Sequence, residues 1–264
     1  MTPEAEQRAA DILLAARRDG RALTGLDEDV RPTTMADGYR IQNRLRAAWC
    51  AATGDRVSGW KVGATAAAVQ EKFGVTAPFG GPFFSSTVFA SPARLTASDF
   101  QHRAIESEFA FRFDKPLLPR AAAYARAEVV AAVDAVVPAI EIVSPRFNDL
   151  LFGRAPIAVA DCALNGGFVF GAPVTNWRAF ALPEHPVTLR VNGAVAAEGN
   201  GSAVLGDPVT ALVWAVNHLS SQNIAVEAGQ IISTGTTTGI VHLVAGDTGV
   251  ADFGLLGTVE VRFA

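Results

Sequence analysis

The 264-residue chain is half hydrophobic and carries a charge on 18% of its residues, a balance typical of a folded globular protein and not of a disordered one. Its net charge of −4 and the absence of a basic run argue against nucleic-acid binding. The two cysteines, Cys50 and Cys162, lie far apart without CxxC spacing, which excludes a disulfide framework and a thiolate zinc site.

The N-terminal segment does not have the pattern of a signal peptide. MTPEAEQRAADILLAARRDG is charged throughout and lacks the apolar centre and small-residue cleavage site of a signal peptide. No apolar stretch reaches the length of a membrane span, because Asp134, Pro138 and Glu141 interrupt the best candidate. We therefore expect a soluble, cytoplasmic protein that binds neither nucleic acid nor a membrane.

The first 55 residues are predicted to be helical. Pro3 begins a run of apolar residues at helical spacing that Gly20 closes, and a second helix is predicted after Thr34. From Ser58 the pattern changes to short apolar runs separated by Gly, Pro and Ser, which are strand and turn signals. We expect an α+β fold that is mostly β, with a helical N-terminal region (residues 1–55) packed on a β-rich domain (residues 56–264).

The second half of the chain predicts two more helices and a series of strands. One helix is expected from Arg126 to Val136, and a stronger one after Asp207, which is an N-cap residue followed by Pro208. Asn192 and Gly193 are expected to form the two-residue turn of a hairpin. The predicted strands cover residues 138–143, 166–171, 187–193, 230–235 and 257–263.

The segment HRAIESEFAFRF, residues 102–113, raises the question of function. Laid out as a strand, it carries Glu106 and Glu108 on one face, while the other face is mostly apolar. An ordinary half-buried strand shows the same alternation, so this segment alone does not distinguish a solvent-exposed strand face from a functional site. Glu141 differs, because it lies in VVPAIEIV, which is apolar on both faces of a strand.

Two more charges are isolated among apolar residues. Lys61 is the only charge in SGWKVGATAAAV, and Asp161 lies in PIAVADCALNGGFVFG. Each charge also has a structural explanation: Glu141 or Asp161 can cap a helix or pair with an arginine such as Arg146, and Lys61 can extend to solvent. Taken together, three glutamates on two strands form an all-oxygen set that suits Mg²⁺ or Mn²⁺, and burying them without a cation would be strongly unfavourable. The histidines show no zinc-ligand spacing.

Six segments resemble, in order and spacing, the 2-keto-4-pentenoate hydratase and 4-oxalocrotonate decarboxylase group of the fumarylacetoacetase superfamily. They are GWKVGAT, IESEFAF, PAIEIVSPRFNDL, VADCALNGGFVFG, GNGSAVLGDPVTALVWAVN and GQIISTGTTTG. The most specific element is the E-x-E strand followed by P-A-x-E; the glycine-rich pieces are less specific. The resemblance implies a fumarylacetoacetase-like rolled β-barrel core with helices outside, usually assembled into a homo-oligomer.

The resemblance also implies a role for each candidate residue. It assigns one Mg²⁺ or Mn²⁺ ion to three glutamates, Glu106, Glu108 and Glu141. Lys61 resembles the family's active-site lysine and Asp161 the acidic residue of its A-D motif, and we expect both to transfer protons. Thr234 resembles the position that holds the substrate carboxylate, and Gly235, Ser86 and Arg146 are further candidates for substrate contacts. The chain departs from the family pattern at Ser85 and Ser86, where many relatives carry an acidic residue, and at Cys162, where relatives often have Asn. Both departures are expected to face the part of the substrate beyond its 2-keto acid head.

The implied activity is that of a hydratase, a lyase that adds water to a 2-hydroxy-2,4-dienoate to give a 4-hydroxy-2-keto acid in aromatic catabolism. A cation held by three carboxylates keeps open positions for a 2-keto acid and can stabilise its enolate. A 4-oxalocrotonate-type decarboxylase, an acylpyruvate hydrolase and a non-catalytic keto-acid-binding relative remain alternatives. The N-terminal region offers no clear His-Glu pair for the hydrolase, and the complete set of glutamates argues against the non-catalytic relative.

Overall fold

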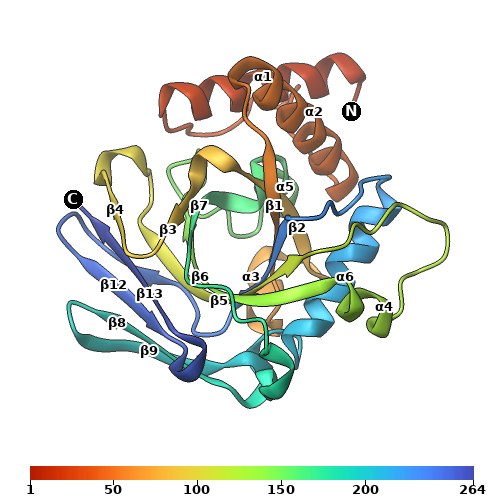
Figure 1. The fold of residues 1–264 in the computed structure, drawn as a ribbon. Helices are drawn as coiled ribbons and strands as arrows, with labels where there is room; N and C mark the ends of the chain where they lie inside the picture. The colour runs from red at the N-terminus through yellow and green to blue at the C-terminus, as the bar shows by residue number, and fades with distance from the viewer.

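The N-terminal region folds into two helices, as its sequence predicts. The computed structural model describes residues 1–264, and α1 (Pro3–Asp19) and α2 (Met35–Thr53) lie together along one side of it (Figure 1). Thr2 caps α1 by accepting a hydrogen bond from the Ala5 N–H, and Gly20 ends the helix with a positive φ of 62°. Both caps are local signals, so the sequence alone places these helix ends correctly.

The centre of the molecule is an eight-stranded sheet that curls into a rolled half-barrel (Figure 1), which confirms the predicted core. Its order is β2-β1-β10-β5-β6-β7-β3, and β11 pairs with β5. The β1–β10 and β3–β7 pairs are parallel, and the others are antiparallel. The strands are β1 (Val57–Gly63), β2 (Phe79–Phe84), β3 (Val88–Ala90), β5 (Ala104–Phe113), β6 (Val133–Val143), β7 (Asn165–Phe170), β10 (Ile231–Thr236) and β11 (Val241–His242).

A second, five-stranded sheet packs beside the rolled one. Its order is β4-β13-β12-β8-β9. Asn192 and Gly193 turn β8 into β9 with φ values of 51° and 85°, as a type I′ turn requires, which confirms the predicted hairpin. The strands are β4 (Ala93–Leu95), β8 (Pro186–Val191), β9 (Ala194–Asn200), β12 (Thr248–Asp252) and β13 (Thr258–Phe263).

The two faces of β5 have different surroundings. Ile105, Phe109 and Phe111 point into the main apolar core, where Phe109 meets Phe253, the residue directly after β12 of the second sheet. The alternate residues face the inside of the rolled sheet, and one of them, Ala110, belongs to a small apolar cluster with Phe83, Val137, Ala139, Phe168 and Phe170. The strand is therefore buried on both faces, and its acidic face is not a solvated surface.

Four further helices complete the fold: α3 (Ala67–Phe73), α4 (Arg126–Ala131), α5 (Ala155–Ala160) and α6 (Pro208–Ser221). Asp207 caps α6 as predicted, by accepting a hydrogen bond from the Val209 N–H. The helix predicted from Arg126 to Val136 is wrong in its second half, because the β-branched residues from Val133 onward pair with β5 as part of β6. No helix combines the length and the apolar surface of a transmembrane segment.

The N-terminal helices share an apolar cluster with the β-rich part of the chain. Leu13 of α1 and Ile41 of α2 are buried in the same cluster as Phe79 of β2 and Val159 of α5. The helices therefore pack directly on the rest of the fold. The division into two domains at residue 55 stays a prediction.

Candidate active site

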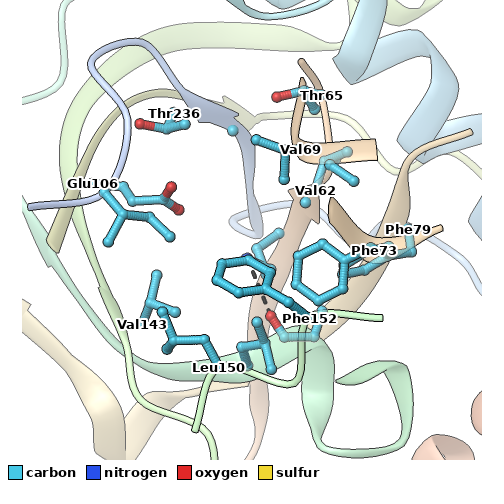
Figure 2. Close-up of a pocket in the computed structure, with 17 residues that line it drawn as sticks. Val62, Thr65, Val69, Phe73, Phe79, Glu106, Val143, Leu150, Phe152 and Thr236 are labelled. Carbon is cyan, nitrogen blue, oxygen red and sulfur yellow. Dashed lines mark hydrogen bonds between the residues drawn. The ribbon is translucent and has the colours of Figure 1, made fainter. Parts of the chain in front are cut away.

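A pocket opens beside the middle strands of the rolled sheet (Figure 2). Glu106 and Thr236 lie on one side of it, and Lys61 also lines the pocket. The facing side is apolar and largely aromatic, with the side chains of Val69, Phe73, Phe79, Leu150 and Phe152. The pocket therefore offers a small polar end and a larger apolar end to a ligand.

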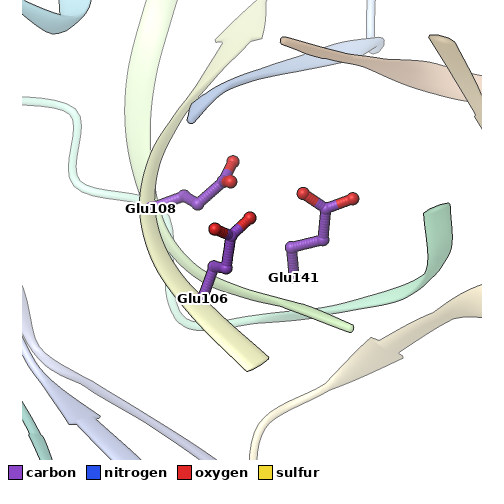
Figure 3. A group of neighbouring side chains, drawn as sticks. All are labelled: Glu106, Glu108 and Glu141. Atoms are coloured by element: carbon purple, nitrogen blue, oxygen red, sulfur yellow. The ribbon is translucent and has the colours of Figure 1, made fainter. Parts of the chain in front are cut away.

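Three glutamates converge at the polar end, where Glu106 lines the pocket and Glu108 and Glu141 lie buried behind it (Figure 3). Glu106 and Glu108 project from the inner face of β5, and Glu141 projects from β6, where it stands directly opposite Glu106 in the antiparallel register. One carboxylate oxygen from each residue lies within 4.8 Å of the others. Glu108 and Glu141 are fully buried, so the sheet register alone brings three acids together away from water.

The protein supports these carboxylates only in part. The Ser233 hydroxyl and the Gly235 N–H donate hydrogen bonds to Oε2 of Glu108, the latter at 3.1 Å. Oε1 of Glu108 is buried and has no hydrogen-bond partner. A carboxylate oxygen left in this state is strongly unfavourable unless a ligand completes its surroundings. Three carboxylates offer only oxygen donors, and one of these oxygens, Oε1 of Glu108, lacks a partner. This combination fits a hard divalent cation.

Glu141 is held by one neutral and one charged group. The Asn165 side-chain amide donates to its Oε1 at 3.0 Å, and the Lys61 ammonium lies 2.9 Å from its Oε2. Lys61 extends from β1 and also donates to the Ala163 carbonyl at 3.2 Å. Both acid and lysine are buried, so Lys61 does not extend to solvent, and the structural explanation considered for it from sequence is wrong.

The electrostatic state of the site follows from three carboxylates and one ammonium group. Burial and then the charge of Glu141 raise the pKa of Glu106 to about 7, and burial with the Glu141 and Glu106 charges raises the pKa of Glu108 well above its usual range. Burial pulls the pKa of Lys61 down, but the three carboxylates outweigh it and raise that pKa, so Lys61 stays an ammonium. Fully ionised, the group carries −2, the charge that a divalent cation would neutralise.

A backbone irregularity in β10 places the Gly235 N–H at Glu108. The pairing of β10 with β5 is interrupted between Ser233 and Thr236, and Gly235 has a φ of 102°. A Cβ at Gly235 would lie 2.3 Å from the Thr65 hydroxyl, so only glycine fits both the backbone and the space. Gly235 lines the pocket, whereas the hydroxyl of its neighbour Thr234 is buried and donates to a main-chain carbonyl of β5 at 2.7 Å.

Besides Thr234, three residues that the sequence assigned to the site lie outside this pocket. Asp161 is fully buried, accepting hydrogen bonds from the Arg146 N–H at 2.6 Å and from Arg17 at 3.3 Å. Arg146 and Ser86 line a different cavity, which Arg17 also borders. The Ser86 hydroxyl donates to the Asp55 carboxylate. Of the two explanations considered for Asp161, pairing with an arginine is the one that these contacts match.

Several residues of the site and its pocket were missed by the sequence interpretation. Asn165 gives a usable signal, because it is an isolated amide at the start of an apolar strand next to the strand of Glu141. Phe73 lies in α3, a helix whose N-cap, Ala66, has no side-chain hydrogen bond, so no capping signal marks it. Phe152 lies in the loop after β6, and nothing local to its sequence points to the pocket.

Comparison with known proteins places the chain in a family. Residues 63–264 match the family model described as fumarylacetoacetate (FAA) hydrolase C-terminal. The match covers more than half of the chain, and the chain therefore belongs to the fumarylacetoacetate hydrolase family. This confirms the resemblance drawn from the six sequence segments.

Individual relatives are similar over nearly their whole length. The 2-hydroxyhexa-2,4-dienoate hydratase of Comamonas testosteroni is 34% identical over 257 residues, which cover 95% of this chain and 94% of the relative. The 2-keto-4-pentenoate hydratase of Paraburkholderia xenovorans (strain LB400) is 30% identical over 263 residues, covering 100% and 96%. The structure of 4-oxalocrotonate decarboxylase from Pseudomonas putida G7, complexed with magnesium and adipate, aligns with a TM-score of 0.92 and 27% identity, covering 100% of this chain and 99% of that one.

Proposed function

We propose that this protein is a metal-dependent hydratase of aromatic catabolism that adds water to a 2-hydroxy-2,4-dienoate and gives a 4-hydroxy-2-keto acid. The observation that carries the proposal is the convergence of three buried glutamates and one lysine at the polar end of a pocket whose far end is apolar. The similarity to two hydratases supports the same class of lyase.

Glu106, Glu108 and Glu141 are the proposed ligands of one Mg²⁺ or Mn²⁺ ion. Their oxygen donors, their −2 net charge with Lys61, and the unpartnered Oε1 of Glu108 all suit such an ion. The similar decarboxylase structure is complexed with magnesium. When bound, the cation would supply Lewis-acid stabilisation to the oxygens of a 2-keto acid head.

The chain's own residues would orient the substrate and supply protons. Lys61 carries a proton at the polar end and would neutralise part of the negative charge of the substrate's carboxylate and enol oxygen. Gly235 and Thr236 line the same end, so we propose the β10 turn as the wall that orients the acid head, with Thr234 fixing that turn from behind. Ser86 and Arg146 have no role in this proposal, because they border another cavity.

The apolar end favours the hydratase over the decarboxylase. Lys61 is the only cationic side chain among the lining residues, and it is already paired with Glu141. A vinyl or methyl end would rest against the aromatic wall, whereas the distal carboxylate of an oxalocrotonate-type diacid would lose its hydration without gaining a partner. The similarity to a 4-oxalocrotonate decarboxylase keeps decarboxylation as the second candidate.

The test is a turnover screen with Mg²⁺, using 2-hydroxypenta-2,4-dienoate, 2-hydroxyhexa-2,4-dienoate and 4-oxalocrotonate. We expect loss of the dienoate ultraviolet absorbance without CO₂ release, and turnover of the diacid at least about 10-fold slower than of the monoacids. Glu106→Gln should lack this activity while keeping the fold. CO₂ release from the diacid as the main reaction would establish the decarboxylase instead. Mn²⁺ binding without turnover of any substrate would favour the non-catalytic relative.

We also infer that the protein assembles into a homo-oligomer, as the family resemblance implies. Large apolar side chains on its surface, Leu118, Val244 and Leu255, suit a partly buried interface, and Leu255 is 86% exposed in the single chain. Sedimentation equilibrium tests this inference. A mass equal to that of one chain at micromolar concentration would contradict it.

A further inference from the structure

The segment between α5 and β7 adopts a backbone conformation that its residues do not favour. Cys162, Ala163 and Leu164 are consecutive, none is glycine, and their φ values are 52°, 54° and 69°. A left-handed backbone brings Cβ too close to the following carbonyl oxygen, so such residues adopt it singly and rarely in succession. Three in a row persist only where the surrounding structure imposes the conformation.

This left-handed turn carries two of the groups that hold the site. The Ala163 carbonyl accepts a hydrogen bond from the Lys61 ammonium at 3.2 Å. Directly after the turn, the Asn165 amide donates to Glu141 at 3.0 Å. Lys61 and Glu141 are themselves paired, so the turn and Asn165 together contact both partners of the ion pair at the polar end of the pocket.

Asp161 and Arg17 fix the two ends of the same turn. The Asp161 carboxylate precedes it, accepting from the Arg146 N–H on one oxygen and from Arg17 Nη2 on the other. Arg17 Nη2 also donates to the Asn165 carbonyl at 3.4 Å, so one guanidinium spans the turn. The side chains of Arg17 and Asp161 are 4% and 0% exposed, and Arg17 comes from α1.

The turn also lies close against β2. A Cβ at Gly81 would be 2.5 Å from the carbonyl carbon of Cys162, and it would approach the Ala163 nitrogen to 2.9 Å. The turn therefore has no free space on that side. Its position is set by β2 beneath it and by the Arg17–Asp161 pair across its ends.

We propose that the Arg17–Asp161 pair is a positioning device: it holds residues 162–164 in their left-handed conformation and so places the Ala163 carbonyl and the Asn165 amide that orient Lys61 and Glu141. Asp161 is then a positioning residue and not the proton-transfer group expected from the sequence. The inference rests on the proposed function of Lys61 and Glu141, and it makes the N-terminal helix α1 part of the support of the site.

The first experiment compares wild type with Asp161→Asn and Arg17→Lys, using Mn²⁺ affinity, turnover and thermal unfolding. Groups that orient metal ligands typically change affinity or activity by about 10–100-fold when removed, and we expect both variants to lose affinity and kcat in that range. The matched control is Arg44→Gln, which removes a contact between α1 and α2 and leaves the turn untouched. The control should unfold at a lower temperature but keep wild-type Mn²⁺ affinity and turnover.

The second experiment separates positioning from proton transfer. Glycine adopts a left-handed backbone without strain. Ala163→Gly in the Asp161→Asn background should therefore restore about half or more of the lost Mn²⁺ affinity and of the lost activity, both on a logarithmic scale. If Asp161 transferred a proton, Ala163→Gly would restore nothing to kcat, and Mn²⁺ affinity would be unaffected by Asp161→Asn in the first place.

The readouts keep this inference distinct from the proposed function. Mn²⁺ affinity is measured without substrate, so an enzyme inactive on every dienoate would contradict the hydratase proposal and leave this test intact. Folded Asp161→Asn and Arg17→Lys variants with wild-type Mn²⁺ affinity would overturn the positioning role. If Asp161→Asn does not fold, Arg17→Lys alone and combined with Ala163→Gly gives the same comparison.

Discussion

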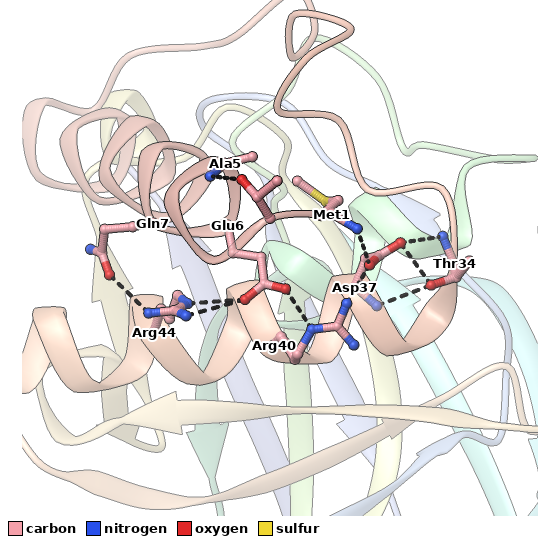
Figure 4. A network of polar contacts seen from close by, with 9 residues as sticks. Met1, Ala5, Glu6, Gln7, Thr34, Asp37, Arg40 and Arg44 are labelled. Carbon is pink, nitrogen blue, oxygen red and sulfur yellow. Dashed lines mark hydrogen bonds and ion pairs between the residues drawn. The ribbon is translucent and has the colours of Figure 1, made fainter.

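Two groups of carboxylates in this molecule are built in opposite ways. At the α1–α2 contact, Glu6 meets Arg40 at 2.5 Å and Arg44 at 3.2 Å, and Asp37 accepts hydrogen bonds from Thr34 and Arg40 (Figure 4). At the pocket, three glutamates share a single cation, Lys61, and the buried Oε1 of Glu108 has neither a hydrogen bond nor an ion pair. The first group is complete within the chain, and the second is not.

The pKa values of the two groups shift in opposite directions, and the balance between burial and hydrogen-bond donors decides the direction of each shift. Burial opposes ionisation of Glu6, but its hydrogen bonds with Arg40 and Arg44 outweigh it and lower its pKa, and the hydrogen bond from the Thr34 hydroxyl is the main cause that lowers the pKa of Asp37 to about 2. At the pocket, burial dominates and raises the pKa of Glu106 to about 7. Acids whose donors come from the protein serve the fold, whereas acids left short of donors indicate a ligand.

Removing one pocket acid should have the largest effect. Glu108→Gln removes one proposed metal ligand, so we expect turnover to fall about 100-fold or more. It also removes one of three mutually repelling acids, so the metal-free protein should unfold at the wild-type temperature or above it. Added Mn²⁺ should stabilise wild type and not the variant, because only wild type binds it tightly. Thermal unfolding with and without Mn²⁺ measures both. A variant that Mn²⁺ stabilises as strongly as wild type would contradict the assignment of Glu108.

Disturbing the β10 turn that supports Glu108 should have an intermediate effect on Mn²⁺ affinity. Gly235→Ala forces a Cβ to 2.3 Å from the Thr65 hydroxyl at a φ of 102°, so we expect a loss of about 1–3 kcal/mol in unfolding free energy and about 10-fold in Mn²⁺ affinity. Gly246→Ala is the matched control, since Gly246 has a φ of 96° and nothing within 4 Å of its Cβ position. It should lose stability through backbone strain alone. Equal Mn²⁺ affinity in the two variants would refute the role given to the β10 turn.

The α1–α2 group should give the smallest effect, confined to stability. Asp37→Asn weakens the cap of α2 and should lower the unfolding free energy by about 1 kcal/mol at neutral pH without changing turnover. Because folding lowers the pKa of Asp37 from 3.8 to about 2, its contribution is fully present above pH 4 and is lost as the pH falls towards 2. Urea unfolding should therefore show wild type and variant converging over that range.

That prediction has its own control in an exposed pair. Asp29 contacts Arg8 on the surface, where both side chains are more than half exposed, so Asp29→Asn should change stability by less than about 0.5 kcal/mol. A difference between wild type and Asp37→Asn that stayed constant down to pH 2 would mean that the charge of Asp37 is not what stabilises the cap.

Sequence reasoning reached the features that depend on local pattern. Strand alternation put Glu106 and Glu108 on one face, and the apolar context of Glu141 excluded a solvated surface; the register then places Glu141 opposite Glu106. The contact between Lys61 and Glu141 depends on a rolled sheet in which β10 and β5 separate β1 from β6, and alternation says nothing about that order. The apolar context singled out Lys61, but only the family resemblance gave it a role in the site.

The errors have the same physical origin. Asp161 looked like a site residue because its segment is apolar, but its partner Arg17 is 144 positions away on α1, and no local signal joins the two. The helix predicted to Val136 had apolar residues that suit either a buried helix or a buried strand, and pairing with β5 decided the matter. The sequence predicts which groups are unusual, while the long-range packing decides what each one contacts.

The opposition of Glu106 and Glu141 has a consequence for folding. Sliding β6 by one residue along β5 would turn Glu141 away from the hollow of the sheet and into the core that holds Phe109 and Phe111. A bare carboxylate among those rings would be penalised by several kcal/mol, so the misaligned hairpin could not compete with the native one. The acids proposed as metal ligands thereby also favour the native alignment of the two longest strands.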